Sequence, residues 1–325
     1  MVHNLNEAQV KAYMSPSLVI DAVEKAFRAL AKQRAINLPR DRLRLPTGVA
    51  QHILQGALLD EGVVGYKAYT SSRQGNYFNV FLSDAHTGAL KAIVEANALG
   101  QWRTGAASAI ATKCMLHTTP NIIGVIGAGW QAEGQIRFLN YCYPHAEFRV
   151  YSRNMNRCID WCRTLSQELQ ISHLSARPTV DEVTREADVI VTATTSSVPV
   201  INKTCLKENV HINAVGANAL NRCEIPENVI RNAWCVVDQR ETAQKECGDL
   251  LSLTEKGFFT WQSLPELGEV LEGYKVKPNH PMQYSVFESH GLGILDVAVA
   301  HAIIQIVESQ SGHISTTRLG LRKKG

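Results

Sequence analysis

The stretch Ile122–Ala132, IIGVIGAGWQA, decides the fold of this 325-residue chain. An apolar run that predicts a buried strand, residues 122–126, leads directly into Gly127-Ala128-Gly129-Trp130-Gln131-Ala132, and a helical pattern follows. In the pattern GxGxxA the first glycine permits a tight turn, the second lets a pyrophosphate approach the backbone, and the small third residue allows close packing of helix on strand. The free N–H groups at the start of the helix then face the phosphates. The stretch therefore predicts a dinucleotide site, and we expect each residue from Gly127 to Ala132 to contribute to it.

The chain after residue 121 continues in the same style. Apolar runs alternate with helical segments, and the runs lie at residues 122–126, 148–151, 189–192, 210–215 and 235–237. Continuous apolar strands separated by helices indicate a parallel sheet that is covered on both faces. We predict an α/β fold in which residues 119–299 form a Rossmann-type doubly wound parallel sheet domain.

The first part of the chain has a different texture. Residues 17–34 place apolar side chains at helical spacing, and residues 101–116, rich in Ala and Thr, predict a buried helix. Between them, turn residues separate strand-like runs at residues 51–54, 63–69, 78–83 and 90–94. We predict an α+β domain over residues 1–118. The last helix, from residue 296 to about residue 309, can pack on either domain.

Composition excludes several classes of protein. The formal net charge of +3 is too small to indicate a nucleic-acid partner, and no run approaches the roughly 18 apolar residues of a membrane span. The N-terminus MVHNLNEAQV lacks the regions of a signal peptide. The eight cysteines form no CxxC and no spacing typical of zinc sites. We expect a cytoplasmic protein with reduced thiols, no metal, no membrane contact and no nucleic acid.

The end of the second predicted strand selects the cofactor. An NAD site usually offers Asp or Glu to the ribose hydroxyls here, but this chain continues with Ser152-Arg153-Asn154 and then Arg157. No carboxylate is present to repel a 2′-phosphate, and Arg153 can pair with one. The sequence therefore favours NADP(H), with NAD(H) as the alternative.

Cationic residues in the first domain predict how a substrate is held. Arg40, Arg42 and Arg44 alternate, so an extended segment puts them on one face. Lys67 lies in an apolar strand, and Arg103 lies among small residues at the start of the buried helix. Guanidinium groups grip carboxylates in bidentate fashion. Such a set suits a small amino or imino acid.

These residues belong to longer segments through which the chain resembles the ornithine cyclodeaminase/mu-crystallin family over nearly its whole length. The matching segments are PRDRLRLP (39–46), GYKAYT (65–70), VFLSDAHTGALKAIVEANALGQWRTGAASAIATK (80–113), GVIGAGWQAEGQ (124–135), ADVIVTATTS (187–196), INAVGAN (212–218) and SVFESHGLGILDVAVA (285–300). The segment at 80–113, followed by the glycine turn, is specific to this family rather than to Rossmann proteins in general.

The resemblance implies a homodimer and a distribution of roles. The first domain joins that of the partner and takes in the C-terminal helix, about residues 300–325, while the second domain binds the nucleotide. Arg42, Lys67 and Arg103 match the substrate-carboxylate and catalytic positions, with Arg42 chosen over Arg44 by its spacing to Pro46. The residues expected near the cofactor are Thr104 at the phosphates, and Thr192, Ala193, Thr194, Val215, Gly216, Ala217, Ser289 and Gly291 at the nicotinamide.

One departure from the family pattern bears on the reaction. In the cyclodeaminases proper an Asp follows the strand ending in AVG and exchanges protons with the substrate, whereas this chain has Asn218 in AVGANALNR. An amide does not act as a carboxylate base at neutral pH. The family's ketimine reductases and some of its amino-acid dehydrogenases also lack this Asp, and mu-crystallin uses NADPH.

The sequence therefore predicts an oxidoreductase, an NAD(P)H-dependent imine (ketimine) reductase or amino-acid dehydrogenase that acts on a small imino or amino acid. Lys67 and Asn218 are its expected catalytic residues. Two alternatives remain open. One is an ornithine cyclodeaminase, which converts L-ornithine to L-proline and ammonia. The other is an NADPH-dependent binding protein of the mu-crystallin type.

Overall fold

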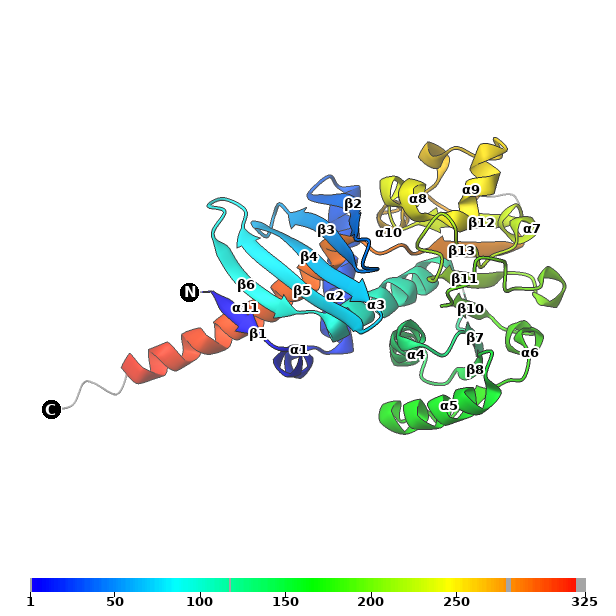
Figure 1. The fold of residues 1–325 in the computed structure, drawn as a ribbon, viewed down its shortest axis with the longest axis horizontal. Helices are drawn as coiled ribbons and strands as arrows, with labels where there is room; N and C mark the ends of the chain where they lie inside the picture. Colours follow the sequence, from blue (N-terminus) through cyan, green and yellow to red (C-terminus); the bar gives the residue numbers. More distant parts are fainter. Residues whose placement is uncertain (1, 117, 279–281, 320–325) are drawn as a thin grey trace.

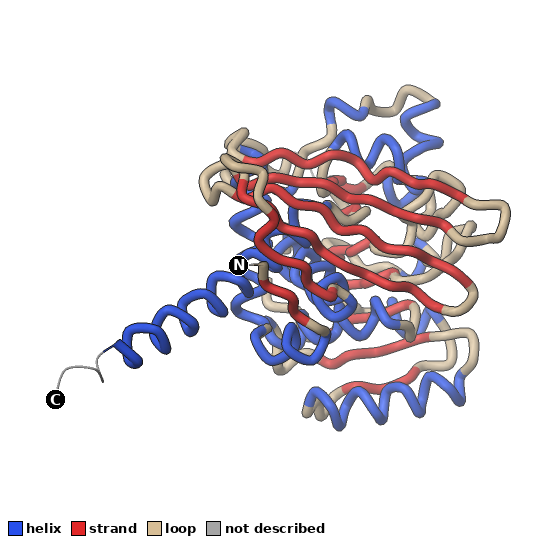
Figure 2. Tube along the Cα trace, turned by 60° about the vertical axis from the view of Figure 1, so that its left-hand side comes forward, coloured by secondary structure: helices blue, strands red, loops and turns tan. Residues whose placement is uncertain are grey.

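The computed structural model describes residues 2–116, 118–278 and 282–319, and it contains two sheets (Figure 1). The first sheet has six strands in the order β1-β6-β5-β4-β3-β2. Its strands are β1 (His3–Leu5), β2 (Ala35–Arg44), β3 (Ala50–Leu58), β4 (Val63–Ser72), β5 (Gly75–Asp84) and β6 (Leu90–Glu95). All pairs are antiparallel except β1 with β6. Figure 2 shows this sheet as one twisted layer with helices behind it. The four strand-like runs predicted between residues 51 and 94 are confirmed as β3 to β6.

The second sheet has seven parallel strands in the order β12-β13-β11-β10-β7-β8-β9. Its strands are β7 (Ile122–Ile126), β8 (Glu147–Tyr151), β9 (Leu174–Ala176), β10 (Val189–Thr192), β11 (Val210–Ala214), β12 (Ala233–Val237) and β13 (Tyr284–Glu288). Alternate residues serve different cores, since Val189 and Val191 enter one cluster and Ile190 the other. The Rossmann-type α/β prediction is therefore confirmed.

Helices cover both faces of the second sheet. They are α4 (Trp130–Cys142), α5 (Met155–Leu169), α6 (Val180–Thr184), α7 (Glu227–Ile230), α8 (Arg240–Glu246) and α9 (Gly248–Glu255), with short 3-10 turns at Lys203–Cys205 and Trp261–Ser263. Helix α10 (Leu267–Leu271) packs instead on α2 (Pro16–Ala31) of the first domain. Strand β13 was missed at the sequence level because YSVFE mixes apolar residues with Ser285 and Glu288, which are nevertheless buried. It lies between β11 and β12 in the interior of the sheet, and its carboxyl end joins those of the neighbouring strands, where the candidate site lies.

The helices of the first domain are α1 (Glu7–Tyr13), α2 (Pro16–Ala31) and α3 (Asn97–Met115). Ser15 caps α2 by accepting from the Leu18 N–H, and the apolar face of this helix is buried as its periodicity predicts. Helix α3 is buried along most of its length and packs against both α2 and α4. It therefore connects the two domains.

The last helix, α11 (Gly293–Leu319), returns to the first domain earlier than the predicted residue 300. Its Ile294 N–H donates to the Asn37 side chain on β2, and the helix packs across β3 and β4. The first turn of α11 already belongs to the first domain, because Asp296 in that turn pairs with a lysine of β4. Residues 320–325 of the predicted C-terminal segment lie outside the described residues.

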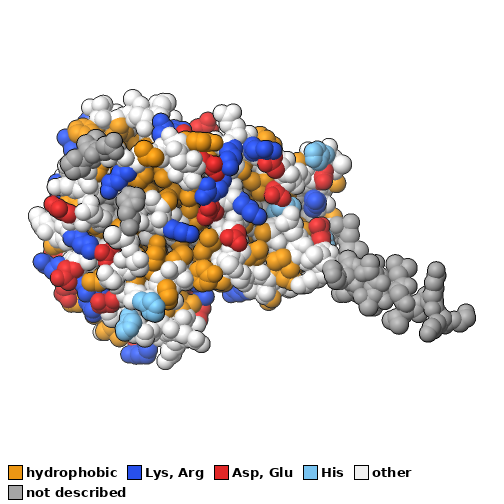
Figure 3. Space-filling model, turned by 180° about the vertical axis from the view of Figure 1, so that it is seen from behind, with side chains coloured by type: hydrophobic (Ala, Val, Ile, Leu, Met, Phe, Trp, Pro, Cys, Tyr) orange, Lys and Arg blue, Asp and Glu red, His pale blue; other side chains and the backbone are white. Residues whose placement is uncertain are grey.

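Within the described ranges, no helix combines the length and apolarity needed to cross a membrane. On the face seen in Figure 3, basic and acidic side chains are interspersed among hydrophobic ones. That face thus lacks the continuous basic stripe with which proteins follow a phosphate backbone.

Candidate active site

A cavity of about 200 Å³ lies between the two domains. The first domain contributes side chains from β2, β4, β5 and α3, and the second contributes the glycine turn and the loops after β11 and β13. The lining residues are Arg40, Lys67, Tyr69, Asn76, Phe78, Gly100, Arg103, Thr104, Trp130, Gln131, Val215, Asn218, Ser289, His290 and Gly291. A cavity of this size suits a molecule as small as an amino acid.

Two cations and one carboxylate form the buried centre of this site. Lys67 Nζ lies 2.8 Å from both carboxylate oxygens of Asp296, and Arg103 Nε donates to Asp296 Oδ1 at 3.1 Å. All three side chains are almost fully buried. One positive charge therefore remains in excess, and an anionic group that enters the cavity is attracted to it. Asp296 was not predicted from the sequence, because it comes next to β4 only when α11 packs against that strand.

Burial lowers the pKa of Lys67 to about 7. The neighbouring Asp296 acts in the opposite direction by favouring the ammonium form, and Arg103 adds to the lowering. A lysine with a pKa near neutrality exchanges a proton readily under physiological conditions. Lys67 is therefore chemically suited to donate or accept a proton at a bound substrate.

Arg103 presents its outer nitrogens to the cavity. Its Nη groups make no hydrogen bond within the described part of the chain, although its Nε is held by Asp296. They lie against Gly291, where an added Cβ would come within 2.9 Å of Nη1. Gly291 has a φ of +86°, so both its conformation and its surroundings require glycine. The guanidinium fork is thus fixed and free to accept a carboxylate.

The three alternating arginines of β2 have different surroundings. Arg40 lines the cavity, donates to the His290 carbonyl at 2.8 Å and pairs with Glu246. Arg42 lies outside the lining, pairs with Glu246 from another side and donates to the Asn218 carbonyl. Arg44 is exposed. Of the three arginines, Arg40 and not the predicted Arg42 lines this cavity, and the assignment of Arg42 to the substrate carboxylate stays a prediction. Spacing alone does not reveal the difference, because the register of β2 shifts between Leu38 and Asp41.

Aromatic side chains form one wall of the cavity. The rings of Tyr69 and Phe78 stack with centroids 4.8 Å apart, and Phe78 stacks on Trp130 at 6.0 Å. Behind them His52 stacks on Tyr69 and bonds to Ser71. Burial, together with the arginines of β2, lowers the pKa of His52 to about 4, which keeps its ring neutral. Trp130 belongs to the glycine turn, so one residue of the nucleotide motif also shapes the substrate cavity.

The glycine turn leaves room for a dinucleotide. Gly127 has a φ of +115°, and an added Cβ would meet the Ala193 carbonyl oxygen at 2.5 Å. Gly129 is the N-cap of α4, where no side chain caps the helix and an added Cβ would meet nothing within 4 Å. Ala132 lies on the buried face of α4. Open space in front of uncapped N–H groups fits a pyrophosphate.

The other predicted cofactor residues gather at the same edge of the sheet. Ser152 to Arg157 follow β8, Thr192 ends β10 and Ala193 and Thr194 follow it, Val215 to Ala217 follow β11, and Ser289 and Gly291 follow β13. This is the carboxyl edge, where ligands bind in open α/β sheets. Asn154 caps α5 by accepting from the Arg157 N–H, so its oxygen is already used.

Glu224 organises two of these loops and was missed at the sequence level. Its carboxylate accepts from Thr192 Oγ1 and from the backbone N–H groups of Thr194 and Gly216, all within 2.9 Å. Burial raises its pKa, and the bonds from Thr194 and Thr192 oppose this effect. Such a carboxylate fixes the loops after β10 and β11 in one geometry.

Asn218 lines the cavity, as its predicted role requires. Its side-chain oxygen accepts from Arg222 Nη1 at 3.1 Å, and its carbonyl accepts from Arg42. Arg222 therefore orients the side-chain amide, and Arg42 holds the backbone of the same residue.

Comparison with known proteins identifies the class. The family model described as "Ornithine cyclodeaminase/mu-crystallin family" matches residues 1–311, so the chain belongs to this family.

Individual relatives agree with this membership. The "Ketimine reductase mu-crystallin" of Macropus fuliginosus is 28% identical over 312 residues, which cover 92% of this chain and 95% of that protein. The structure of Thermococcus litoralis Delta(1)-pyrroline-2-carboxylate reductase in complex with NADH and L-proline has a TM-score of 0.87 and 26% identity, covering 95% of this chain and 98% of that one. An archaeal alanine dehydrogenase dimer with bound NAD has a TM-score of 0.85 and 27% identity, covering 95% and 97%.

Replacement of Arg40 and of Arg42, one at a time, tests which of these two arginines binds the substrate carboxylate. We expect Arg40→Met to raise KM for a carboxylate substrate about 10–100-fold, because it removes a charged hydrogen bond worth about 1.5–3 kcal/mol. Arg42→Met is the matched control, since it also removes a partner of Glu246, and its KM should stay within a few-fold of the parent value. Steady-state kinetics with both variants checks this. A larger rise of KM in Arg42→Met than in Arg40→Met would instead support the predicted binding of the carboxylate by Arg42.

Proposed function

We propose that this protein is an NAD(P)H-dependent reductase of the C=N bond next to a carboxylate in a small imino acid, and that it oxidises the corresponding amino acid in reverse. The observation that carries the proposal is the buried cluster of Lys67, Arg103 and Asp296, with one excess positive charge, in an amino-acid-sized cavity beside the dinucleotide turn. Membership of the family, whose members include a ketimine reductase and a pyrroline-2-carboxylate reductase, supports it.

In this proposal the chain binds, orients and exchanges a proton. Arg103 and Arg40 hold the substrate carboxylate, and Lys67 places a proton at the imine nitrogen, while Asp296 positions both Lys67 and Arg103. The nicotinamide, when bound, supplies the hydride for the imine carbon. Burial of the cluster excludes water, which strengthens each of these electrostatic contacts. Asn218 orients the substrate or a water molecule without exchanging a proton.

The two alternatives each conflict with a feature of the site. A cyclodeaminase needs an acid–base group where this chain has Asn218, whose amide is held by Arg222. A protein that only binds NADPH has no need of a buried lysine with a pKa near 7. Imine reduction uses both features as they stand.

A substrate panel separates these functions. We expect NADPH consumption with cyclic or linear ketimino acids, and no stoichiometric proline and ammonia from L-ornithine with catalytic NAD+. Proline and ammonia without net turnover of the cofactor would mean a cyclodeaminase. If no ketimine is reduced while NADPH still raises the melting temperature, the binding-protein function is favoured.

The pKa of Lys67 predicts opposite pH profiles for the two directions. The ammonium form predominates below pH 7, so kcat/KM for imine reduction should fall about tenfold per pH unit above that value. Oxidation of the amine needs the neutral lysine, so its rate should rise up to pH 7 and then level off. Lys67→Arg keeps the charge but removes the titration and should abolish the alkaline limb of the reduction profile. Persistence of that limb in the variant would assign it to another group.

We propose NADP(H) as the preferred cofactor. Arg153 and Arg157 are exposed beyond β8 and form no ion pair with an acidic residue in the described part of the chain, so both remain available for a 2′-phosphate. No carboxylate occupies the loop after β8 to repel this group. Two structural relatives carry NADH or NAD, so the preference rests on this loop alone.

Arg153→Ala tests the preference. We expect the variant to weaken NADPH binding about 10–100-fold by loss of a charge-assisted contact, with little change for NADH. Arg163→Ala, on helix α5 but paired with Asp160, is the control and should leave both affinities unchanged. Titration of each nucleotide by calorimetry gives the four values. Equal weakening of NADPH and NADH by Arg153→Ala would contradict the preference.

We also propose a homodimer formed through the first sheet. The outer face of this sheet exposes large apolar side chains, including Ile36, Leu38, Val64 and Tyr66. A contiguous exposed apolar face marks an interaction surface. The alanine dehydrogenase relative is a dimer, which favours a second copy of this chain as the occupant.

A further inference from the structure

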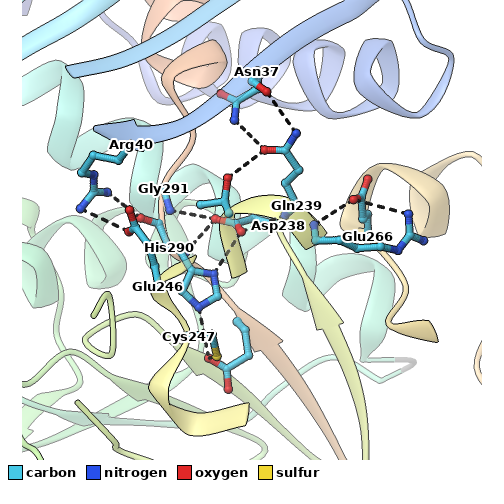
Figure 4. A network of polar contacts seen from close by, with 12 residues as sticks. Asn37, Arg40, Asp238, Gln239, Glu246, Cys247, Glu266, His290 and Gly291 are labelled. Carbon is cyan, nitrogen blue, oxygen red and sulfur yellow. Dashed lines mark hydrogen bonds and ion pairs between the residues drawn. The ribbon is translucent and has the colours of Figure 1, made fainter. Parts of the chain in front are cut away.

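Three side chains of ligand type meet next to the loop that follows β13, and Figure 4 labels two of them, Cys247 and His290. One sulfur, carboxylate or imidazole atom from each of Cys247, Glu288 and His290 lies within 4.8 Å of the other two. Cys247 connects α8 to α9, Glu288 ends β13, and His290 follows in the loop that lines the cavity. All three are buried. The sequence analysis predicted no metal site because Cys247 and Glu288 are 41 residues apart.

The Cys247 thiol donates to Glu288 Oε2 at 3.6 Å, but the imidazole of this cluster has no such partner on its facing side. His290 Nε2 lies 4.0 Å from Glu288 Oε2, which is too long for a hydrogen bond. Neither His290 Nε2 nor Glu288 Oε1 has a hydrogen-bond partner among the described residues. Buried polar atoms are rarely left in this state. A cation bound between His290 and Glu288 would give each of these two buried side chains a partner.

Asp238 fixes the tautomer of His290 that a cation requires. Its Oδ1 lies 3.2 Å from His290 Nδ1, and its Oδ2 accepts from the backbone N–H groups of His290 and Gly291 at 2.7 and 2.8 Å. A carboxylate accepts hydrogen bonds, so Nδ1 carries the proton and the Nε2 lone pair faces Cys247 and Glu288. Carboxylates hold metal-binding histidines in this same arrangement.

The spacing is close to that of a tetrahedral zinc site. Bond lengths of about 2.3 Å to sulfur and 2.1 Å to oxygen put these two ligands about 3.6 Å apart. Cys247 Sγ and Glu288 Oε2 are 3.6 Å apart. Nitrogen and oxygen ligands of zinc lie about 3.4 Å apart, so the imidazole must approach by about 0.6 Å.

The surroundings carry an excess of acid that a dication would offset. The buried carboxyl groups around the cluster belong to Glu224, Asp238, Glu246, Asp249 and Glu288. The cations that approach from β2, Arg40 and Arg42, both pair with Glu246. A dication bound by a thiolate, a carboxylate and a neutral imidazole forms a neutral unit. The burial of all three side chains is compatible with such a neutral unit.

We propose that Cys247, Glu288 and His290, with a water molecule as the fourth ligand, bind one Zn²⁺ ion per chain, and that Asp238 is the positioning residue of His290. Mixed sulfur, nitrogen and oxygen ligands match the preferences of zinc. The ion fixes the loop from Ser289 to Gly291, whose His290 carbonyl receives Arg40 and whose Gly291 abuts Arg103. This site stands independently of the reaction proposed above.

Metal analysis of the full-length protein tests the site. After expression with added zinc and removal of loosely bound ions, we expect one zinc per chain, and close to none in Cys247→Ser and in His290→Gln. Cys235→Ser is the matched control, because this thiol is equally buried on β12 but bonds to backbone carbonyls instead. It should retain the zinc. Asp238→Asn should weaken zinc binding about 10–100-fold.

Cobalt substitution keeps the proposal testable even if a variant fails to fold. In the chelator-treated parent protein, added Co²⁺ should give thiolate-to-cobalt charge-transfer absorption and the visible bands of a tetrahedral site. Zinc should also raise the melting temperature of this apoprotein. Absence of both effects in the parent protein, or full zinc content in a folded Cys247→Ser variant, would overturn the proposal.

Discussion

The carboxylate of Asp296 is the contact on which the candidate site depends. It meets a lysine of β4 and an arginine of α3, and it is carried by a third element, α11. Breaking a buried ion pair leaves an uncompensated charge at a cost of about 3–5 kcal/mol. Here one carboxylate holds two cations and remains one charge short of neutralising them. The same contact therefore fastens α11 to the first domain and leaves the cavity receptive to an anion.

The two domains meet through elements that belong to both. Helix α3 packs on α2 and on α4, and it supplies Gly100, Arg103 and Thr104 to the cavity wall. The loop after β13 joins the second sheet directly to α11. The cavity thus lies where covalent connections cross between domains, so its walls are fixed by the chain itself as well as by packing.

Most of the fold could be predicted from local pattern, and the centre of the site only in part. Apolar runs gave β7 and β10 to the residue, because a buried parallel strand is apolar throughout. Strand β13 was missed since buried Ser285 and Glu288 interrupt that pattern, and the pairing of Ser285 with His211 becomes visible only once the sheet is assembled. Lys67 and Arg103 were found as charges in apolar surroundings. Asp296 and Glu224 were missed because their partners are distant in sequence, and Arg40 was passed over because a shift in strand register follows from no spacing rule.

The position of Trp130 has a consequence for how substrate range can evolve. This residue occupies one of the variable positions of GxGxxA, where the dinucleotide turn imposes no identity, and its ring forms part of the substrate wall with Phe78. In the proposed function, the nucleotide motif therefore encodes part of the substrate selectivity. A lineage can then enlarge or reshape the cavity by exchanging this one side chain, without altering the glycines of the turn or the cations of the buried cluster.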